Sequence, residues 1–323
     1  MVSGNSNFST ILTTTLANYG KEIFDAVSTN NALLFILKKA GNIKIVAGGE
    51  SFNHPLIYGT NSSFQAYSSM ETISLPLTNL ATRAVFPQKV LAGSIVLSSL
   101  EMAQNAGQRE KLLDLAEVKK KEAEISMSEL MGDQVFADGS GAKDFDGIQY
   151  LINESPASQT DVGGIDSSAS GNEYWRNYSS DTVVSAFNTS NEGLNEWRLA
   201  VTSTTKGRQG PKLIVTTPTI FNLYETGLTA NIRYVDTELA DAGFLNLQYK
   251  TMPVVFDDNC PSGNTYFVDT DSLWLQVLAQ ANMQITQFQQ HSDKLATSAI
   301  MWLAGNLTTG SRRTQGVIDS TTG

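Results

Sequence analysis

The sequence predicts an α+β protein, and three observations lead to that prediction. Residues 98–135 repeat apolar side chains at helical spacing, residues 42–97 hold alternating segments typical of strands, and residues 181–285 mix both patterns. The chain has 323 residues, of which 41% are hydrophobic, so it can bury a substantial core. Its length exceeds what one core usually serves, and we expect two packed units or one extended shape.

Residues 8–40 carry two short amphipathic helical patterns. The first places apolar residues along one helical face, at Ile11, Leu12, Leu16, Tyr19, Ile23, Phe24 and Val27. The second covers residues 33–37 and ends at Lys38 and Lys39 before Gly41, as helix C-termini commonly do. Neither helix is long enough for a core of its own, so we expect this segment to lie on something else.

Residues 42–97 predict one long β-hairpin. Polar residues alternate with Ile43 and Ile45, and again with Ile73, Leu75 and Leu77, before a second arm returns at residues 85–90. The tip between the arms has few large apolar residues. An isolated two-stranded hairpin is only marginally stable in water, so we expect this arm to lean on a neighbouring molecule.

The longest predicted helix spans residues 98–135. Ser98 and Glu101 have the spacing of a capping box, and ten charged side chains lie between Arg109 and Glu124. The charges predict a solvated face, and a narrow apolar face comprises Leu112, Leu115, Ala116, Ala123, Met127, Leu130 and Met131. Acidic residues interleave with the lysines, which disfavours nucleic-acid binding at this helix.

The C-terminal half predicts alternating helices and strands. We expect helices around Trp197 and from Ile220, and a buried strand at residues 212–216. Segments 254–256 and 266–268 flank a Cys-Pro-Ser-Gly turn and predict a hairpin. The tail, residues 287–318, is predicted to return as strand.

The charge balance excludes several functions. The chain has 32 acidic and 22 basic residues, a net charge of −10, which argues against tight nucleic-acid binding because that depends on Lys and Arg. There is one cysteine, no visible signal peptide, and no apolar stretch near the ~20 residues of a membrane span. We expect a soluble cytosolic protein.

No catalytic or metal-binding pattern is visible. His54 precedes Pro55 and is predicted to lie in a loop, and Cys260 is predicted in a turn. The glycine-rich segment 138–141 lacks the features of a phosphate loop, and acidic pairs such as Asp257–Asp258 are typical of solvated turns. The sequence therefore predicts no catalytic residue, no metal site and no cofactor, and function must be sought in how the chain is built.

Several stretches along the chain form an ordered set. The most specific stretch is Gly163-Gly164-Ile165-Asp166, followed by Trp175-Arg176-Asn177. The others are residues 30–34 with 38–39, 99–107, 112–115, 138–139, 147–152, 253–263, and 305–308 with 312–313. The ordered set covers roughly residues 8–320, and it resembles the major capsid protein of tailed bacteriophages, with its Hong Kong 97-type fold.

The resemblance implies a division of the chain and a function. It implies an N-terminal arm at 1–45, an E-loop hairpin at 46–90, a peripheral domain at 91–150 and 286–323 with a spine helix at 98–135, and an axial domain at 151–285. It implies a major capsid protein that self-assembles into pentamers and hexamers of an icosahedral shell enclosing the phage genome. The arm and the hairpin would lie across neighbouring subunits.

The same resemblance implies partners and a location. The partners would be other copies of the chain, portal proteins, scaffolding or decoration proteins, and double-stranded DNA enclosed without sequence-specific binding. The location would be the virion, assembled in the host bacterial cytoplasm without a membrane. For contacts between subunits we single out Tyr58, Phe64, Tyr67, Arg83, Lys119, Lys120, Arg176, Arg312 and Arg313. The charged ones would form inter-subunit ion pairs or remain solvated, and exposed pairs contribute only ~0–1 kcal/mol each.

Three alternatives stay open at this point. The nearest is an encapsulin-like compartment shell of the same fold, which would hold cargo enzymes in place of a genome. Another is an α/β enzyme that uses its acidic residues and has a discrete pocket. The third is a cell-surface layer protein, against which the missing secretion signal counts.

Overall fold

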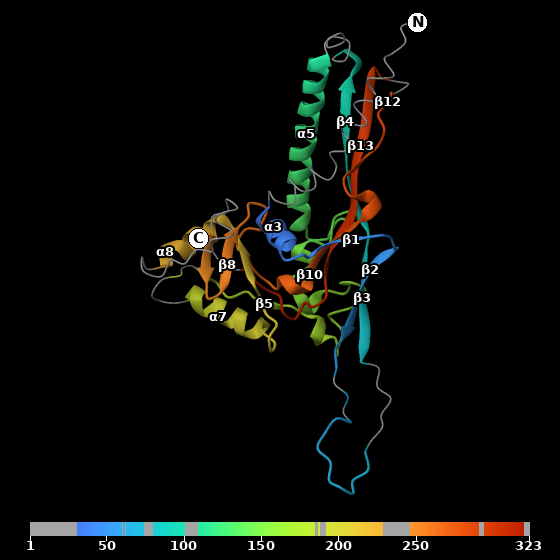
Figure 1. Cartoon of the computed structure of the whole chain (residues 1–323). Coiled ribbons are helices and arrows are strands. Elements are labelled where there is room, and N and C mark those ends of the chain that lie inside the picture. The colour runs from blue at the N-terminus through green and yellow to red at the C-terminus, as the bar shows by residue number, and fades with distance from the viewer. Residues whose placement is uncertain are drawn as a thin grey trace.

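A computed structural model of the chain describes residues 31–59, 61, 63–73, 80–100, 109–184, 187, 192–228, 246–290 and 294–319. The molecule is elongated, with a rounded body and a projection at either end (Figure 1). One projection is the hairpin of β2 (Ser51–Ile57) and β3 (Ala81–Pro87). The other is the helix α5 (Arg109–Val135), beside the strands β4 (Lys89–Ser98) and β13 (Ala296–Thr309).

The remaining elements form the body. Its helices are α3 (Ala32–Lys39), α6 (Ile148–Leu151), α7 (Glu192–Thr204) and α8 (Pro218–Gly227). Its strands are β1 (Ile43–Val46), β5 (Tyr178–Ser180), β6 (Leu213–Thr216), β7 (Asn246–Tyr249), β8 (Met252–Phe256), β9 (Thr265–Val268), β10 (Leu273–Leu278), β11 (Gln284–Ile285), β12 (Gln289–Gln290) and β14 (Gly316–Ile318). Short 3-10 helices lie at Pro156–Ser158, Glu173–Trp175, Thr270–Ser272 and Ala279–Ala281.

The first sheet is organised around β13. Strand β4 runs antiparallel to it from Lys89 opposite Gly305 to Ser98 opposite Ala296, while β10 pairs with the other end of β13 and with β1. Alternate residues on one face of this ribbon are apolar and buried, among them Ile95 of β4 and Met301 of β13. The helix α5 covers that face with Met127 and its neighbours, so the main core of the molecule continues into the projection as a narrow strip.

The second sheet has the order β5-β14-β9-β6-β8-β7 and is buried on both faces. On β6, Leu213 and Val215 join the core shared with the first sheet, while Ile214 faces the helices α7 and α8. Under those helices Trp197 packs against the rings of Phe187 and Tyr224, with centroids 4.9 and 4.7 Å apart. A strand buried on both faces has a continuous apolar run, which is why residues 212–216 could be predicted.

The predicted hairpin across the Cys-Pro-Ser-Gly turn is wrong. Strands β8 and β9 are not neighbours, because β6 lies between them, parallel to β8 and antiparallel to β9. The connection from Asp257 to Asn264 is long enough to step over one strand. All four residues of β6 are buried, so this strand gains most from the central position, which a pattern of local turn chemistry does not reveal.

Several predicted elements are confirmed. The second helical pattern is α3, whose first turn is capped by the side chain of Asn31, and the helices at 192–204 and 218–227 form as expected. The spine helix is helical over Arg109–Val135, while residues 101–108 lie outside the described residues, as does the first helical pattern of the N-terminal segment. No helix of the described ranges is both long and apolar enough to cross a membrane.

Strand pairing runs across the boundary predicted at residue 285. Strand β10, from the predicted axial domain, pairs with β13, and β14, from the predicted peripheral domain, pairs with β9 and β5. One buried cluster extends from α5 through the first sheet onto the second. The two parts are therefore interlocked through their strands, and sequence position alone does not separate them.

Candidate assembly surfaces

The root of the hairpin is fixed to the body by close packing. Phe52, Ala84 and Phe86 are buried, and the backbone N–H of Val85 donates to the carbonyl of Gly163 at 2.8 Å. Gly163 has a φ of 62°, and a Cβ added there would lie 3.0 Å from side-chain carbons of Ala84 and Phe86. The glycine at the start of the most specific stretch thus permits the body to approach the hairpin.

A polar contact at the same root involves His54. Its ring stacks on that of Trp274 in β10, with centroids 4.7 Å apart, and its Nε2 lies 3.0 Å from Oγ1 of Thr308 and 3.3 Å from the side-chain nitrogen of Gln276. The Lys44 ammonium lies 4.4 Å from the same indole. Burial, together with the charge of Lys44, lowers the pKa of His54 to about 4.

The prediction that His54 lies in a loop is therefore wrong. It sits in strand β2 and is buried between Phe52 and Leu56 at alternate positions. That alternation was the available signal, and Pro55 hid it because proline is uncommon inside strands. Here Pro55 occupies an exposed position of the strand.

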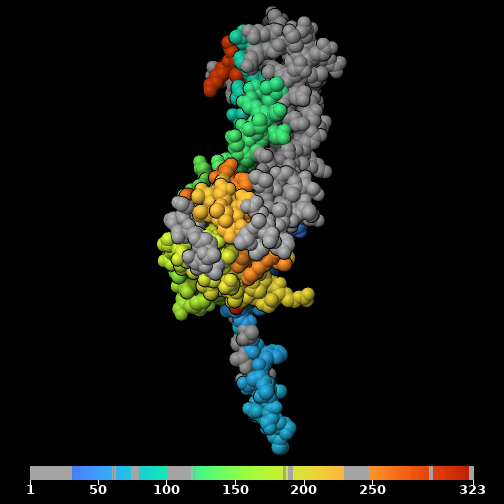
Figure 2. Space-filling view, turned by 90° about the vertical axis from the view of Figure 1, so that its left-hand side faces the viewer, coloured from blue at the N-terminus to red at the C-terminus, as the bar shows by residue number. Residues whose placement is uncertain are grey.

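The tip of the hairpin exposes apolar side chains. Phe64 is 87% exposed and Met70 is 96% exposed, and the exposed Ile57 and Ile73 lie nearby in the chain. Figure 2 shows this part of the hairpin standing clear of the body. The subunit itself does not bury this apolar surface, and an interface role for Phe64 stays a prediction.

A second fixed point of the body is Arg312, whose side chain is fully buried. Its guanidinium donates to the carbonyls of Leu151 (2.7 Å) and Trp175 (3.0 Å) and to the side-chain oxygens of Asn177 (2.9 Å) and Gln159. It ties the turn between β13 and β14 to the segment that follows α5. Burial lowers the pKa of Arg312 to about 10, so it remains charged at neutral pH.

The predicted role of Arg312 between subunits is wrong. A side chain with no exposed surface, and with its donors bound inside its own chain, is not available to a neighbour. The sequence pair Arg312-Arg313 looks symmetrical, but only Arg313 is exposed. The burial depends on residues 135 positions and more away, which no local pattern shows.

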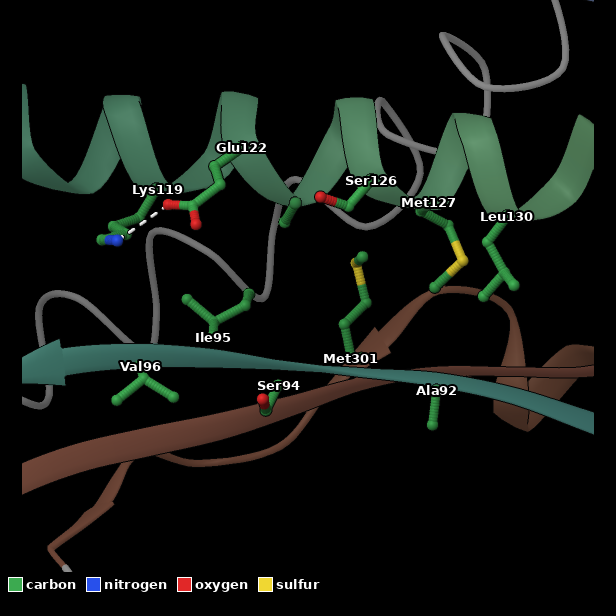
Figure 3. Close-up of a pocket in the computed structure, with 12 residues that line it drawn as sticks. Ala92, Ser94, Ile95, Val96, Lys119, Glu122, Ser126, Met127, Leu130 and Met301 are labelled. Atoms are coloured by element: carbon green, nitrogen blue, oxygen red, sulfur yellow. Dashed lines mark hydrogen bonds and ion pairs between the residues drawn. The ribbon is translucent and has the colours of Figure 1, made fainter.

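A shallow groove lies between α5 and β4 (Figure 3). Its volume is about 380 Å³, and the side chains of Ile95 and Met301 point toward the helix, whereas Ala92 and Val96 point away. The ion pair of Lys119 with Glu122, 2.7 Å long, closes one end. This pair lies within one chain, and an inter-subunit role for Lys119 stays a prediction.

The other predicted interface residues differ in their surroundings. Tyr58 stacks on Tyr174 at 4.6 Å, the hydroxyl of Tyr67 donates to the carbonyl of Ser63, and Arg176 donates to the carbonyls of Ser167 and Ser168. Arg83 and Phe64 are exposed on the hairpin, and Arg313 is exposed on the body. The side chain of Lys120 lies outside the described part of the chain.

The chemistry-bearing residues form no reactive arrangement in the described part of the chain. Cys260 is buried, and burial raises the pKa of its thiol well above the ordinary range. Asp257 is buried, which contradicts the predicted solvated turn, and it accepts hydrogen bonds from the side chain of Asn31 and the backbone of Asn259. Its neighbour Asp258 is exposed. No group of three or more potential metal ligands occurs among the described residues.

Comparison with known proteins gives matches in structure but not in sequence. No protein-family model matches the chain, and no curated protein sequence matches it either. The capsid of cyanophage A-1(L) matches with a TM-score of 0.63 and 16% identity, over 89% of this chain and 93% of that chain. The capsid of a native GTA particle gives 0.58 and 13%, over 88% and 90%. The SrpI encapsulin of Synechococcus elongatus PCC 7942 gives 0.54 and 7%, over 88% and 87%.

These matches define the class of the fold. The chain has the Hong Kong 97-type capsid fold, as predicted, with a projecting hairpin, a long helix and a second sheet flanked by helices. Both phage capsids and an encapsulin share it. The fold alone therefore fits a shell protein and leaves the contents of the shell open.

Proposed function

We propose that this chain is the major capsid protein of a tailed bacteriophage. Its copies assemble into pentamers and hexamers that form an icosahedral shell around double-stranded DNA. The observation that carries the proposal is the hairpin, which presents Phe64 and Met70 to solvent at its tip, away from its own body. In a chain with this fold, such a tip is best explained by a neighbouring copy that covers it.

The phage shell is favoured over the compartment shell by the comparisons. The cyanophage capsid has the higher TM-score, 0.63 against 0.54 for the encapsulin, and the higher identity, 16% against 7%. The acidic net charge of −10 suits a shell from which DNA must be released, since it limits adhesion of phosphates to the wall. The chain acts as a structural protein and not as an enzyme.

The division into arm, hairpin, peripheral domain and axial domain is part of this proposal. So are the further partners, which are portal proteins and scaffolding or decoration proteins, and the location in the virion after assembly in the host cytoplasm. The interlocked strands β10 and β14 fit a subunit whose two parts move as a unit.

Electron microscopy of the purified protein tests the proposal. We expect closed shells of uniform size, and a homogeneous ~35 kDa monomer at high concentration would contradict it. Particles purified from infected cells should contain phage DNA, whereas particles filled with an enzyme would favour the encapsulin alternative. Deletion of the hairpin tip alone, about residues 59–79, should leave a soluble folded subunit that no longer forms shells, because the buried root residues Phe52 and Ala84 stay in place.

A further inference from the structure

The second sheet has edges of opposite charge. Strands β6 and β8 are parallel, with Thr216 beside Phe256. The loop that precedes β6 and the turn that follows β8 therefore lie at opposite ends of the strands, and here an edge of the sheet means one of these two ends. We call the first the basic edge, defined by Lys206, Arg208 and Arg313. The second is the acidic edge, defined by Glu129, Asp133 and Asp258. Strand β14 begins at the basic edge because it runs antiparallel to β9.

The basic edge contains a groove of about 510 Å³ beneath the root of the hairpin. Lys206 and Arg313 line it, and Arg208 is exposed on the same loop as Lys206. From residue 197 to residue 224 the chain has basic side chains and no acidic one. None of the three basic side chains forms an ion pair with another described residue.

Two carboxylates also line this groove, but both are already engaged. Asp271 forms an ion pair with Lys212 at 2.5 Å. Asp269 is buried and accepts hydrogen bonds from the backbone of Asp271 and the hydroxyl of Ser272, each 3.1 Å long. The charge that remains available in the groove is therefore positive.

The acidic edge forms a groove of about 530 Å³ where α5 meets the end of β8. Glu129 and Asp133 project from α5, and Asp258 follows Asp257 after the strand. Glu129, Asp133 and Asp258 are exposed and form no ion pair with another described residue, and no basic residue lines the groove. Three exposed carboxylates that line one groove repel one another, and a cationic partner would relieve this repulsion.

The two edges cannot meet within one chain, because the second sheet separates them. A two-fold dimer requires both halves of a contact on one face of the subunit, so opposite edges favour a head-to-tail contact that repeats around a ring. The hairpin root lines the basic groove and α5 lines the acidic one, and these two projections leave the body at opposite ends of the molecule (Figure 1).

We propose that the basic edge of each subunit binds the acidic edge of the next copy in the ring. The inference rests on the proposed shell function and names the partner surface for this part of the subunit. Exposed ion pairs contribute little affinity each and are screened by salt, so their main effect is on the order and register of the subunits.

Charge reversal and rescue test the pairing. The basic-edge variant is Lys206→Glu with Arg313→Glu, and the acidic-edge variant is Glu129→Lys with Asp258→Lys. We expect each to lower the fraction of protein in closed shells about tenfold or more at moderate salt, because like charges then face each other. The combination of all four changes should restore shells to within about twofold of the unmodified chain. A matched control, Lys143→Glu with Lys294→Glu, should assemble normally.

The outcomes separate this inference from the proposed function. If the unmodified chain forms no shells, the proposed function itself is wrong. If the unmodified chain forms shells, and the basic-edge and acidic-edge variants also assemble normally, the pairing is wrong. Failure of the combined variant while circular dichroism shows a folded subunit would likewise overturn it. As a second measurement, Lys206→Gln with Arg313→Gln should weaken the salt dependence of assembly of the folded protein, and an unchanged salt dependence would contradict the pairing.

Discussion

The ring of His54 in the hairpin stacks on the ring of Trp274 in the body, with centroids 4.7 Å apart and planes 12° apart. Nε2 of the same imidazole is within hydrogen-bonding distance of Thr308. The contact joins strands that are more than 200 positions apart in sequence, so it reports directly on whether the hairpin is docked. The ammonium of Lys44 lies 4.4 Å from the centroid of the same indole, so a positive charge is close to this titratable group.

Acid should weaken the docking of the hairpin. The pKa of His54 is about 4 in the folded chain and 6.5 in the unfolded chain, so unfolding is accompanied by proton uptake between these values. The part of the free energy of unfolding that depends on neutral His54 is fully present above pH 6.5 and is lost as the pH falls toward 4. The loss is about 2 kcal/mol after allowance for solvent screening. Denaturant titrations at pH 7 and pH 4 measure it. In His54→Gln this component of the pH dependence should vanish, and an unchanged profile would show that other groups cause it.

Removal of the Arg312 side chain should destabilise the body. Arg312→Met removes four hydrogen bonds, two of them to buried backbone carbonyls, which predicts a loss of about 3 kcal/mol or more in the free energy of unfolding. Chemical denaturation of the subunit gives the value. The neighbouring Arg313→Met should change it by less than about 0.5 kcal/mol, because that side chain is exposed. Equal losses in the two variants would contradict the assignment of Arg312 as the internal anchor.

Two adjacent glycines allow the cost of close packing to be measured separately from the cost of backbone strain. Gly163 and Gly164 both have positive φ, 62° and 74°, but only a Cβ at Gly163 would contact the hairpin root. Gly164→Ala should therefore cost about 1–2 kcal/mol from backbone strain alone. Gly163→Ala should cost about 1–3 kcal/mol more, because Ala84 and Phe86 must move. Thermal unfolding of both variants measures the difference, and the absence of one would mean that the root is loosely packed.

Polar substitutions at the tip should block assembly without affecting folding. Phe64→Ser with Met70→Ser removes apolar surface that the subunit itself does not bury, so its melting temperature should stay within about 2 °C. Shell formation, followed by light scattering, should fall strongly. A control at exposed polar positions, Gln65→Ser with Ser69→Ala, should assemble normally. Shells from the Phe64 and Met70 variant at the normal rate would show that the tip is not an interface.

The sequence predicted those elements whose signals are local. The helix α3 has a capping Asn31 and terminal lysines, and the strand β6 contains the apolar run 213–215, so both could be identified. The pairing of β8 with β6 could not, because it depends on which strand occupies the centre of a sheet. The fold class was predictable because the order of the segments, more than any one of them, specifies it.

The site was predicted less well, for a related physical reason. The exposure of Phe64 at the hairpin tip could be predicted, because few large apolar residues lie near it in the sequence. The burial of Arg312 next to the exposed Arg313 could not be predicted, because it depends on contacts with distant residues, Leu151 and Asn177 among them. The alternation of His54 with Phe52 and Leu56 is a local signal for a strand, and Pro55 masks it because proline is uncommon inside strands.

The long register between β4 and β13 has a mechanical consequence. The two strands are paired without interruption from Lys89 to Ser98, and they lie along the long axis of the molecule. Tension applied along that axis loads all of these hydrogen bonds together in shear, whereas a sideways pull would open them one after another. The subunit is thus stiffest in the direction that joins its two projections.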